Sequence, residues 1–164
     1  MLTSKCYRVV LPTLLVALML HMWPLPDWLK YARPEWLTLV LIYWALAIPE
    51  QVGVTFAWVA GLLLDVTQGA ILGQHALGLV VVIFVIQLEY QRIRVFSLAQ
   101  QALVIFLLLL IKQILVLWVS GMVGQAPDLG LYFLPSLTGA ILWPWLFMVL
   151  RDLRRRFTVS SRSF

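Results

Sequence analysis

The stretch LAQQALVIFLLLLIKQILVLWV, residues 98–119, decides the fold class of this chain. Lys112 is the one charged residue in it. A helix that crosses the ~30 Å hydrocarbon core of a bilayer needs roughly 20 predominantly apolar residues, and this stretch supplies them. We therefore expect a membrane-spanning helix here.

The rest of the chain has the same character. Hydrophobic residues make up 63% of its 164 residues, and the mean hydropathy is +0.97. A water-soluble domain of this size exposes a large share of its surface and could not cover so much apolar area. The composition thus predicts an all-α polytopic membrane protein. We expect residues 1–157 to form a single transmembrane helical bundle and residues 158–164 to form a flexible cytoplasmic tail.

Six apolar segments predict six transmembrane helices. They run from Tyr7 to Trp23, Pro34 to Ile48, Val52 to Val66, Ala70 to Leu88, Leu98 to Val119 and Leu131 to Leu150. The second and third are short for a span, and short helices are accommodated by local thinning of the bilayer or by low tilt.

The distribution of Lys and Arg predicts the orientation. With six spans and the N-terminus inside, nine of the 12 basic residues lie on the cytoplasmic side, two lie outside, and Lys112 lies within a span. The nine are Lys5, Arg8, Arg92, Arg94, Arg151, Arg154, Arg155, Arg156 and Arg162. By the positive-inside rule, both termini are cytoplasmic. The excess positive charge then faces anionic lipid, and we expect no nucleic-acid partner.

Three ionisable residues lie within apolar segments: Asp65, His75 and Lys112. At 1.5 Å per residue, all three are roughly 20 Å from the cytoplasmic end of their segments. A charge in hydrocarbon costs at least about 2.5 kcal/mol, so each needs a partner or a wet cavity. One interpretation is a polar layer with an Asp65–Lys112 ion pair. The alternative is that each residue reaches the outer interface or bonds a backbone carbonyl.

Catalytic chemistry has little support in the sequence. One cysteine, Cys6, and two histidines without a metal-ligand spacing predict no metal site, and we expect no cofactor. Asp65 is the one carboxylate deep in a span, so an aspartyl dyad is not available. Ser120 and Ser136 are expected to be packing or helix-end hydroxyls. We therefore expect the protein not to be an enzyme.

Small residues collect in the third and fourth segments, at Gly61, Gly69, Gly73 and Ala76. Small residues at such spacings let transmembrane helices approach closely. Packing within the chain is the default explanation. The competing hypothesis is that these four residues form a groove that binds a partner protein.

Four motifs carry a resemblance to a known family. They are RPEW (33–36), GLLLDVTQGAILG (61–73), FSLAQQ (96–101) and LWPW (142–145). In this order and spacing they resemble the MreD family of rod shape-determining proteins, over essentially the whole chain through Phe157. Asp65, Gly69 and Gly73 are the motif members that carry over.

The resemblance implies an integral protein of the bacterial cytoplasmic membrane within the cell-elongation machinery. The implied partners are MreC, through its transmembrane helix, and, indirectly, MreB, a class B penicillin-binding protein and RodA. The implied fold is similar to that of the six-helix substrate-binding subunits of energy-coupling-factor transporters. No catalytic residue is implied.

Two functions therefore compete. The first is a non-catalytic membrane scaffold that binds MreC and supports lateral peptidoglycan synthesis and rod shape. The second is a small-molecule-binding or transport subunit, with an outward-facing cavity lined by Asp65, His75 and Lys112.

Overall fold

The computed structural model describes the backbone of residues 2–125 and 127–159, and the side chains of residues 7–125 and 127–157. Seven helices occupy the described residues and follow one another without strands. They are α1 (Leu2–Met22), the 3-10 helix η1 (Asp27–Ala32), α2 (Trp36–Ala47), α3 (Val54–Gln68), α4 (Gln74–Val95), α5 (Leu98–Met122) and α6 (Leu134–Val159). The prediction of an all-α protein is confirmed.

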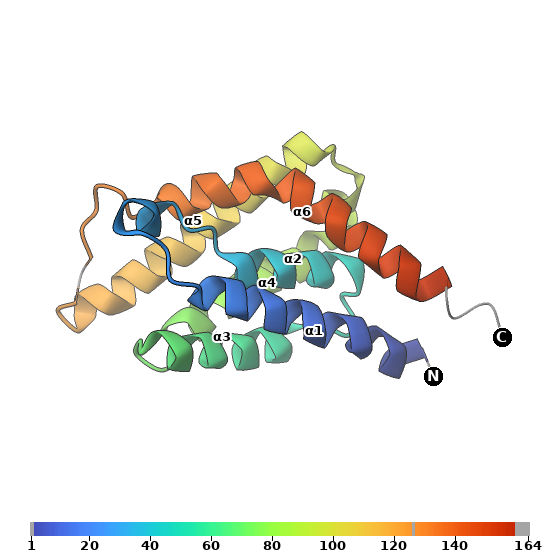
Figure 1. The fold of residues 1–164 in the computed structure, drawn as a ribbon, viewed down its shortest axis with the longest axis horizontal. Coiled ribbons are helices and arrows are strands. Elements are labelled where there is room, and N and C mark those ends of the chain that lie inside the picture. Colours follow the sequence, from blue (N-terminus) through green and yellow to red (C-terminus); the bar gives the residue numbers. More distant parts are fainter. Residues whose placement is uncertain (1, 126, 160–164) are drawn as a thin grey trace.

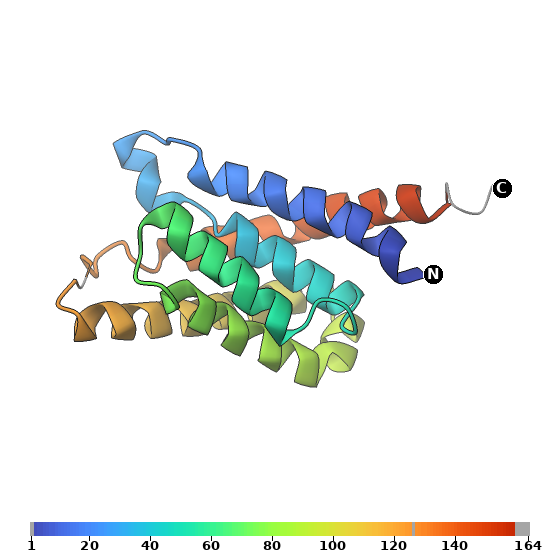
Figure 2. The same cartoon turned by 90° about the horizontal axis from the view of Figure 1, so that it is seen from below.

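The α-helices form one elongated bundle with two distinct ends (Figures 1 and 2). At one end, called here the termini end, lie the start of α1, the end of α6, the α2–α3 connection and the α4–α5 turn. At the opposite end, called the η1 end, lie η1, the α3–α4 turn and the segment between α5 and α6. The six α-helices therefore run along the bundle in alternating direction.

Helix α2 is the central helix of the bundle. All residues from Leu37 to Leu46 are buried, and α2 packs on α1, α4 and α6. A helix that is apolar all round belongs inside a protein or a membrane. Its 12 residues span only about 18 Å at 1.5 Å per residue, so α2 is shorter than the hydrocarbon core. The neighbouring helices extend past both of its ends.

The outer surface of the bundle is apolar. Large hydrophobic side chains are exposed along every long helix, among them Leu11, Leu15, Met19, Leu63, Phe84, Leu103, Leu107 and Ile141. A water-soluble monomer rarely exposes a continuous apolar surface of this extent. Three helices are long and apolar enough to cross a membrane, Gln74–Val95, Leu98–Met122 and Leu134–Phe157. The prediction of a membrane protein is confirmed.

Local signals set several helix ends. Ser97 and Gln100 form a capping box at the start of α5, in which Gln100 N–H donates to the Ser97 hydroxyl and Ser97 N–H donates to the Gln100 side chain. Helix α3 ends at Gly69, whose φ of 63° is left-handed and suits glycine. Helix α6 continues to Val159, and the rest of the predicted tail, residues 160–164, lies outside the described residues.

Candidate functional site

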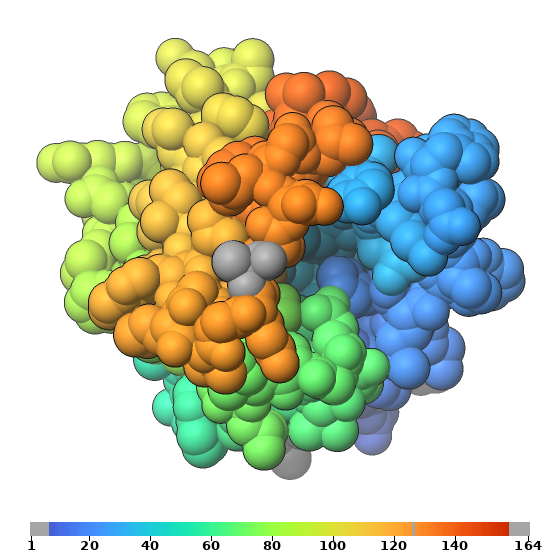
Figure 3. All heavy atoms as spheres, turned by 90° about the vertical axis from the view of Figure 1, so that its left-hand side faces the viewer, coloured from blue at the N-terminus to red at the C-terminus, as the bar shows by residue number. Residues whose placement is uncertain are grey.

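A polar cavity of about 610 Å³ opens at the η1 end of the bundle. It lies beyond the first residue of the central helix α2. Figure 3 looks onto this end and shows a hollow bordered by the blue segment that includes η1, the green α3–α4 region and the orange segment before α6. The short length of α2 explains the position of the cavity, because the surrounding helices continue where α2 has not yet begun.

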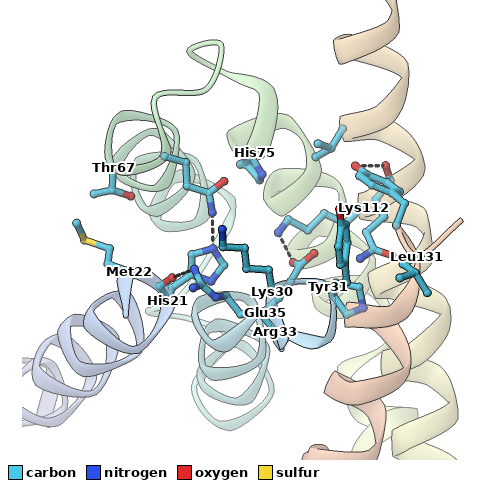
Figure 4. A pocket seen from close by; sticks show the side chains of 15 residues that line it. His21, Met22, Lys30, Tyr31, Arg33, Glu35, Thr67, His75, Lys112 and Leu131 are labelled. Carbon is cyan, nitrogen blue, oxygen red and sulfur yellow. Dashed lines mark hydrogen bonds and ion pairs between the residues drawn. The ribbon is translucent and has the colours of Figure 1, made fainter. Parts of the chain in front are cut away.

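Side chains from six parts of the chain line this cavity (Figure 4). Its polar lining consists of His21, Lys30, Tyr31, Arg33, Glu35, Thr67, Gln68, His75, Lys112, Gln113 and Tyr132. Glu35 is the one carboxylate among these lining residues, against three basic side chains. The cavity is therefore rich in hydrogen-bond donors, and an anionic or strongly polar small molecule would suit it better than a cation.

Lys112 and Glu35 form an ion pair on the inner wall of the cavity. The Lys112 ammonium donates to Glu35 Oε2 and, at 2.9 Å, to the Thr38 hydroxyl. Thr38 in turn donates to Glu35 Oε2 at 2.8 Å. The side chain of Lys112 is only 2% exposed and that of Glu35 is 14% exposed. These contacts satisfy a buried charge and join α5 to the start of α2.

Gly78 makes the position of Lys112 possible. A Cβ atom at Gly78 would lie 2.7 Å from Cγ of Lys112, which is too close for a real contact. The lysine stem therefore crosses α4 where that helix has no side chain. A glycine in the middle of a helix lowers the stability of the helix by about 1 kcal/mol relative to alanine. Here the glycine leaves the space through which Lys112 reaches its ion-pair partner.

Asp65 lies behind the cavity wall and caps helix α4. Its fully buried carboxylate accepts the backbone N–H of Gly73 at 2.8 Å and that of His75 at 2.8 Å. Nδ1 of the His75 ring lies 2.8 Å from Asp65 Oδ1. A carboxylate only accepts hydrogen bonds, so this geometry places the His75 ring proton on Nδ1. Asp65 thus holds the otherwise unpaired N–H groups at the start of α4 and orients His75 toward the cavity.

The structure modifies the predicted polar layer. His75 and Lys112 both line the cavity, and Asp65 supports His75 from the protein interior. The expected Asp65–Lys112 ion pair is wrong, because Lys112 pairs with Glu35 and Asp65 bonds the start of α4. Equal depth along two helices does not place two side chains on facing sides, and Glu35 is nearer to Lys112 in space despite its distance in sequence.

The four small residues fall into two groups with different roles. A Cβ atom at Gly61 would lie 2.3 Å from Cα of Ala76, and both residues are buried, so α3 and α4 touch backbone to backbone here. Gly69 and Gly73 have φ values of 63° and 96°, and a Cβ atom would meet nothing within 4 Å at either position. The structure thus places Gly61 and Ala76 in internal packing, and Gly69 and Gly73 in a turn that requires left-handed backbone.

The opposite wall of the cavity is built on the end of α1. Arg33 donates to the backbone carbonyls of His21 and Trp23, both at 2.6 Å, and so neutralises the end of that helix. Nε2 of Gln68 hydrogen-bonds Nε2 of the His21 ring, which joins α3 to α1. Burial raises the pKa of Tyr132 to about 12, so this phenol remains protonated and donates to the Gln113 carbonyl at 3.3 Å.

Hydroxyl groups near the cavity serve helix packing. Gln74 donates to Ser120 Oγ at 2.6 Å, and the Ser136 hydroxyl donates to the Gln113 side chain. These bonds fit the packing role expected for both serines. Within residues 7–125 and 127–157, the structure shows no group of three or more His, Cys, Asp or Glu side chains that could hold a metal ion.

The predictions from the sequence missed the contacts that Glu35, Thr38 and Gly78 make with Lys112. Glu35 stands in the RPEW motif directly before an apolar segment, where a carboxylate is ordinarily read as a solvated helix start. Thr38 and Gly78 carry no charge and give no signal of their own. The available signal was Lys112 itself, because a lysine deep in a span requires a carboxylate partner from some other helix.

Comparisons with known proteins identify the same family as the sequence motifs. The family model described as rod shape-determining protein MreD matches residues 3–153. The rod shape-determining protein MreD of Haemophilus influenzae is 33% identical over 147 residues, which cover 90% of this chain and 91% of that protein. No solved structure matches the chain. The expected similarity to the substrate-binding subunits of energy-coupling-factor transporters therefore stays a prediction.

Proposed function

The chain belongs to the MreD family of rod shape-determining proteins, and from this premise we propose that it is a non-catalytic scaffold of the bacterial cell-elongation complex. In this proposal it binds the transmembrane helix of MreC in the cytoplasmic membrane and supports lateral peptidoglycan synthesis. MreB, a class B penicillin-binding protein and RodA are indirect partners. The observation that carries the proposal is that the deeply buried ionisable groups join helices to one another: Asp65 joins α3 to α4, and Lys112 joins α5 to α2.

The proposed topology has six spans with both termini in the cytoplasm. Helices α4, α5 and α6 have the length and composition of spans, while α2 and α3 are shorter. A short α2 is compatible with this topology because it lies inside the bundle and not against lipid. The start of α1 and the end of α6 lie at one end (Figure 1), and eight of the nine basic residues expected on the cytoplasmic side belong to the described segments at that end. The positive-inside rule then supports a cytoplasmic termini end.

A groove between α1 and α6 offers the best surface for a partner helix. It has a volume of about 590 Å³, with Val40 of α2 in its lining. Its walls present Val16 and Leu20 from α1, and Trp145 and Val149 from α6, all substantially exposed. Figure 1 shows α1 and α6 on either side of α2. One further apolar helix in this groove would cover the exposed side chains of α1 and α6, as expected for helix-in-groove recognition.

Filling this groove tests the scaffold proposal. Val16→Trp places an indole inside the groove. Leu103→Trp places the same side chain outside the groove, on the lipid-facing side of α5. With tagged protein and MreC produced together, we expect Val16→Trp to lose co-purification of MreC and to fail to restore rod shape. Leu103→Trp should retain both. Both variants must be present in the membrane at the wild-type level. If Val16→Trp retains MreC at the wild-type ratio, the proposed partner surface is wrong.

The cavity at the η1 end supports a second candidate function. Its volume of about 610 Å³ and its donor-rich lining suit a small anionic or polar ligand. In the proposed topology this cavity faces outward, as a binding or transport subunit requires. Native mass spectrometry of the purified protein distinguishes the two functions. A small molecule that co-purifies with the wild type, and is lost from a variant of the cavity residue Lys30, supports ligand binding.

A further inference from the structure

A second cavity, of about 430 Å³, lies at the termini end of the bundle, beyond the last turn of α2. We call it the arginine cavity, because Arg94, Arg151 and Arg154 line it. None of its lining residues within the described part of the chain is acidic. We propose that the arginine cavity binds the phosphate of an anionic phospholipid headgroup.

The positive charge of the cavity comes from arginines on two helices that the fold brings together. Arg94 comes from α4, whereas Arg151 and Arg154 come from α6, and these helices converge beside the end of α2. Arg94 donates to the carbonyls of Leu46 at 2.6 Å and Ala47 at 2.9 Å. These two bonds hold its guanidinium at the cavity wall and use two of its five N–H donors.

Arg151 forms a long ion pair with Asp152, and its side chain is 40% exposed. Its Nε atom lies 3.8 Å from Asp152 Oδ1, which is beyond hydrogen-bond distance. The same Nε is buried and has no hydrogen-bond partner among the described residues. An unsatisfied buried donor on a charged group is unfavourable, and an anion that entered the cavity would supply the acceptors that Arg151 lacks through small side-chain adjustment.

Tyr43 adds a phenol to the wall of the arginine cavity. Its side chain belongs to the buried α2, it is only 2% exposed, and it lines the arginine cavity. Its ring is fixed by edge-to-face contacts with Trp44 and Phe147. Arg151 and Arg154 act electrostatically on its phenol. A phosphate oxygen between the arginines and Tyr43 would accept a hydrogen bond from this phenol.

The position of the cavity selects lipid as the source of the phosphate. The cavity lies where the apolar surface of α6 gives way to its basic last turns, as at the surface of a bilayer. Phe147 and Leu46 give part of its lining an apolar character. A phospholipid whose headgroup enters the cavity, while its acyl chains remain in the bilayer, fits a lining that is both basic and partly apolar. The inference requires only that the termini end meets a membrane surface, and it does not depend on the scaffold proposal.

The test compares lipid binding by the full chain in detergent, measured by native mass spectrometry during titration. The probes are dimyristoyl-phosphatidylglycerol, dimyristoyl-phosphatidylcholine and inorganic phosphate. We expect the wild type to prefer phosphatidylglycerol to phosphatidylcholine. Arg151→Gln should weaken phosphatidylglycerol binding about fivefold, which corresponds to the usual contribution of one basic residue near anionic lipid. Tyr43→Phe, which keeps the ring contacts, should weaken it about tenfold, as expected for one hydrogen bond to a charged group.

Arg156→Gln is the matched control, because it removes the same charge from the same helix outside the cavity. It should bind phosphatidylglycerol as the wild type does. Equal losses in Arg156→Gln and Arg151→Gln would show general charge attraction and overturn the proposal. If the two single variants, Tyr43→Phe and Arg151→Gln, both bind phosphatidylglycerol as the wild type does, the proposal is also overturned. If inorganic phosphate saturates the cavity and prevents phosphatidylglycerol binding, the lipid proposal is wrong and the ligand is a soluble phosphate.

Discussion

The carboxylate of Asp65, near the end of α3, accepts the backbone N–H of Gly73 at 2.8 Å, at the start of α4. The same carboxylate accepts the N–H of His75 at 2.8 Å. Two successive helices are thereby locked together across a short turn. An aspartate deep in an apolar segment is a helix cap in this protein, and its charge is stabilised by N–H groups at the positive end of α4.

Removal of this cap should destabilise the protein. Asp65→Ala leaves buried N–H groups of α4 without acceptors, at a cost of about 2 kcal/mol. For a chain of this size, such a loss lowers the melting temperature by about 4–8 °C. A thermal melt in detergent measures it, with Asp128→Ala as an exposed control. A melting temperature of Asp65→Ala equal to that of the wild type would contradict the capping role.

The Lys112–Glu35 pair predicts a non-additive double-mutant cycle. Lys112→Met or Glu35→Gln alone removes one partner and leaves a charged or polar group stranded in low dielectric, at a cost of about 3–5 kcal/mol. The double variant should be more stable than the sum of the two losses implies. Thermal melts of the four proteins provide the measurement. Strict additivity would mean that the two side chains do not interact.

The contact between Gly61 and Ala76 predicts an unusually damaging small substitution. Gly61→Ala places a Cβ atom 2.3 Å from the Ala76 backbone and must push α3 and α4 apart. We expect strongly reduced accumulation in the membrane, as for overpacking in a rigid core. Gly121→Ala is the matched control in α5, where a Cβ atom meets nothing within 4 Å and alanine favours the helix by about 1 kcal/mol. Equal membrane levels of the two variants would refute the close contact.

The proposed topology is tested at the C-terminus. A phosphatase fused after Phe164 should be inactive, and a fluorescent protein at the same site should fluoresce, because that end carries the basic residues. The reciprocal fusion, a phosphatase inserted in the segment between α5 and α6, should be active. Strong phosphatase activity at Phe164 would exclude a cytoplasmic C-terminus.

Helix positions were largely predictable because hydropathy is a local property of the sequence. The predicted start of the fifth segment coincides with that of α5 at Leu98, and the second segment differs from α2 by one or two residues at each end. The sixth segment ends too early, since α6 continues nine residues beyond Leu150 through its basic turns. Hydropathy marks where a helix leaves hydrocarbon, and a helix can continue into water.

The sequence by itself determined the membrane environment, the helical class and the need for partners at Asp65 and Lys112, because each follows from the cost of polar groups in hydrocarbon. Only the tertiary structure decided which groups are the partners of Asp65 and Lys112. Lys112 reaches Glu35 across 77 positions, past a helix that carries glycine at the crossing. That pairing depends on how α2, α4 and α5 are rotated and packed, and helix rotation follows from the sum of many side-chain contacts rather than from any one segment. The placement of a cavity at each end of the short central helix was settled by the same packing.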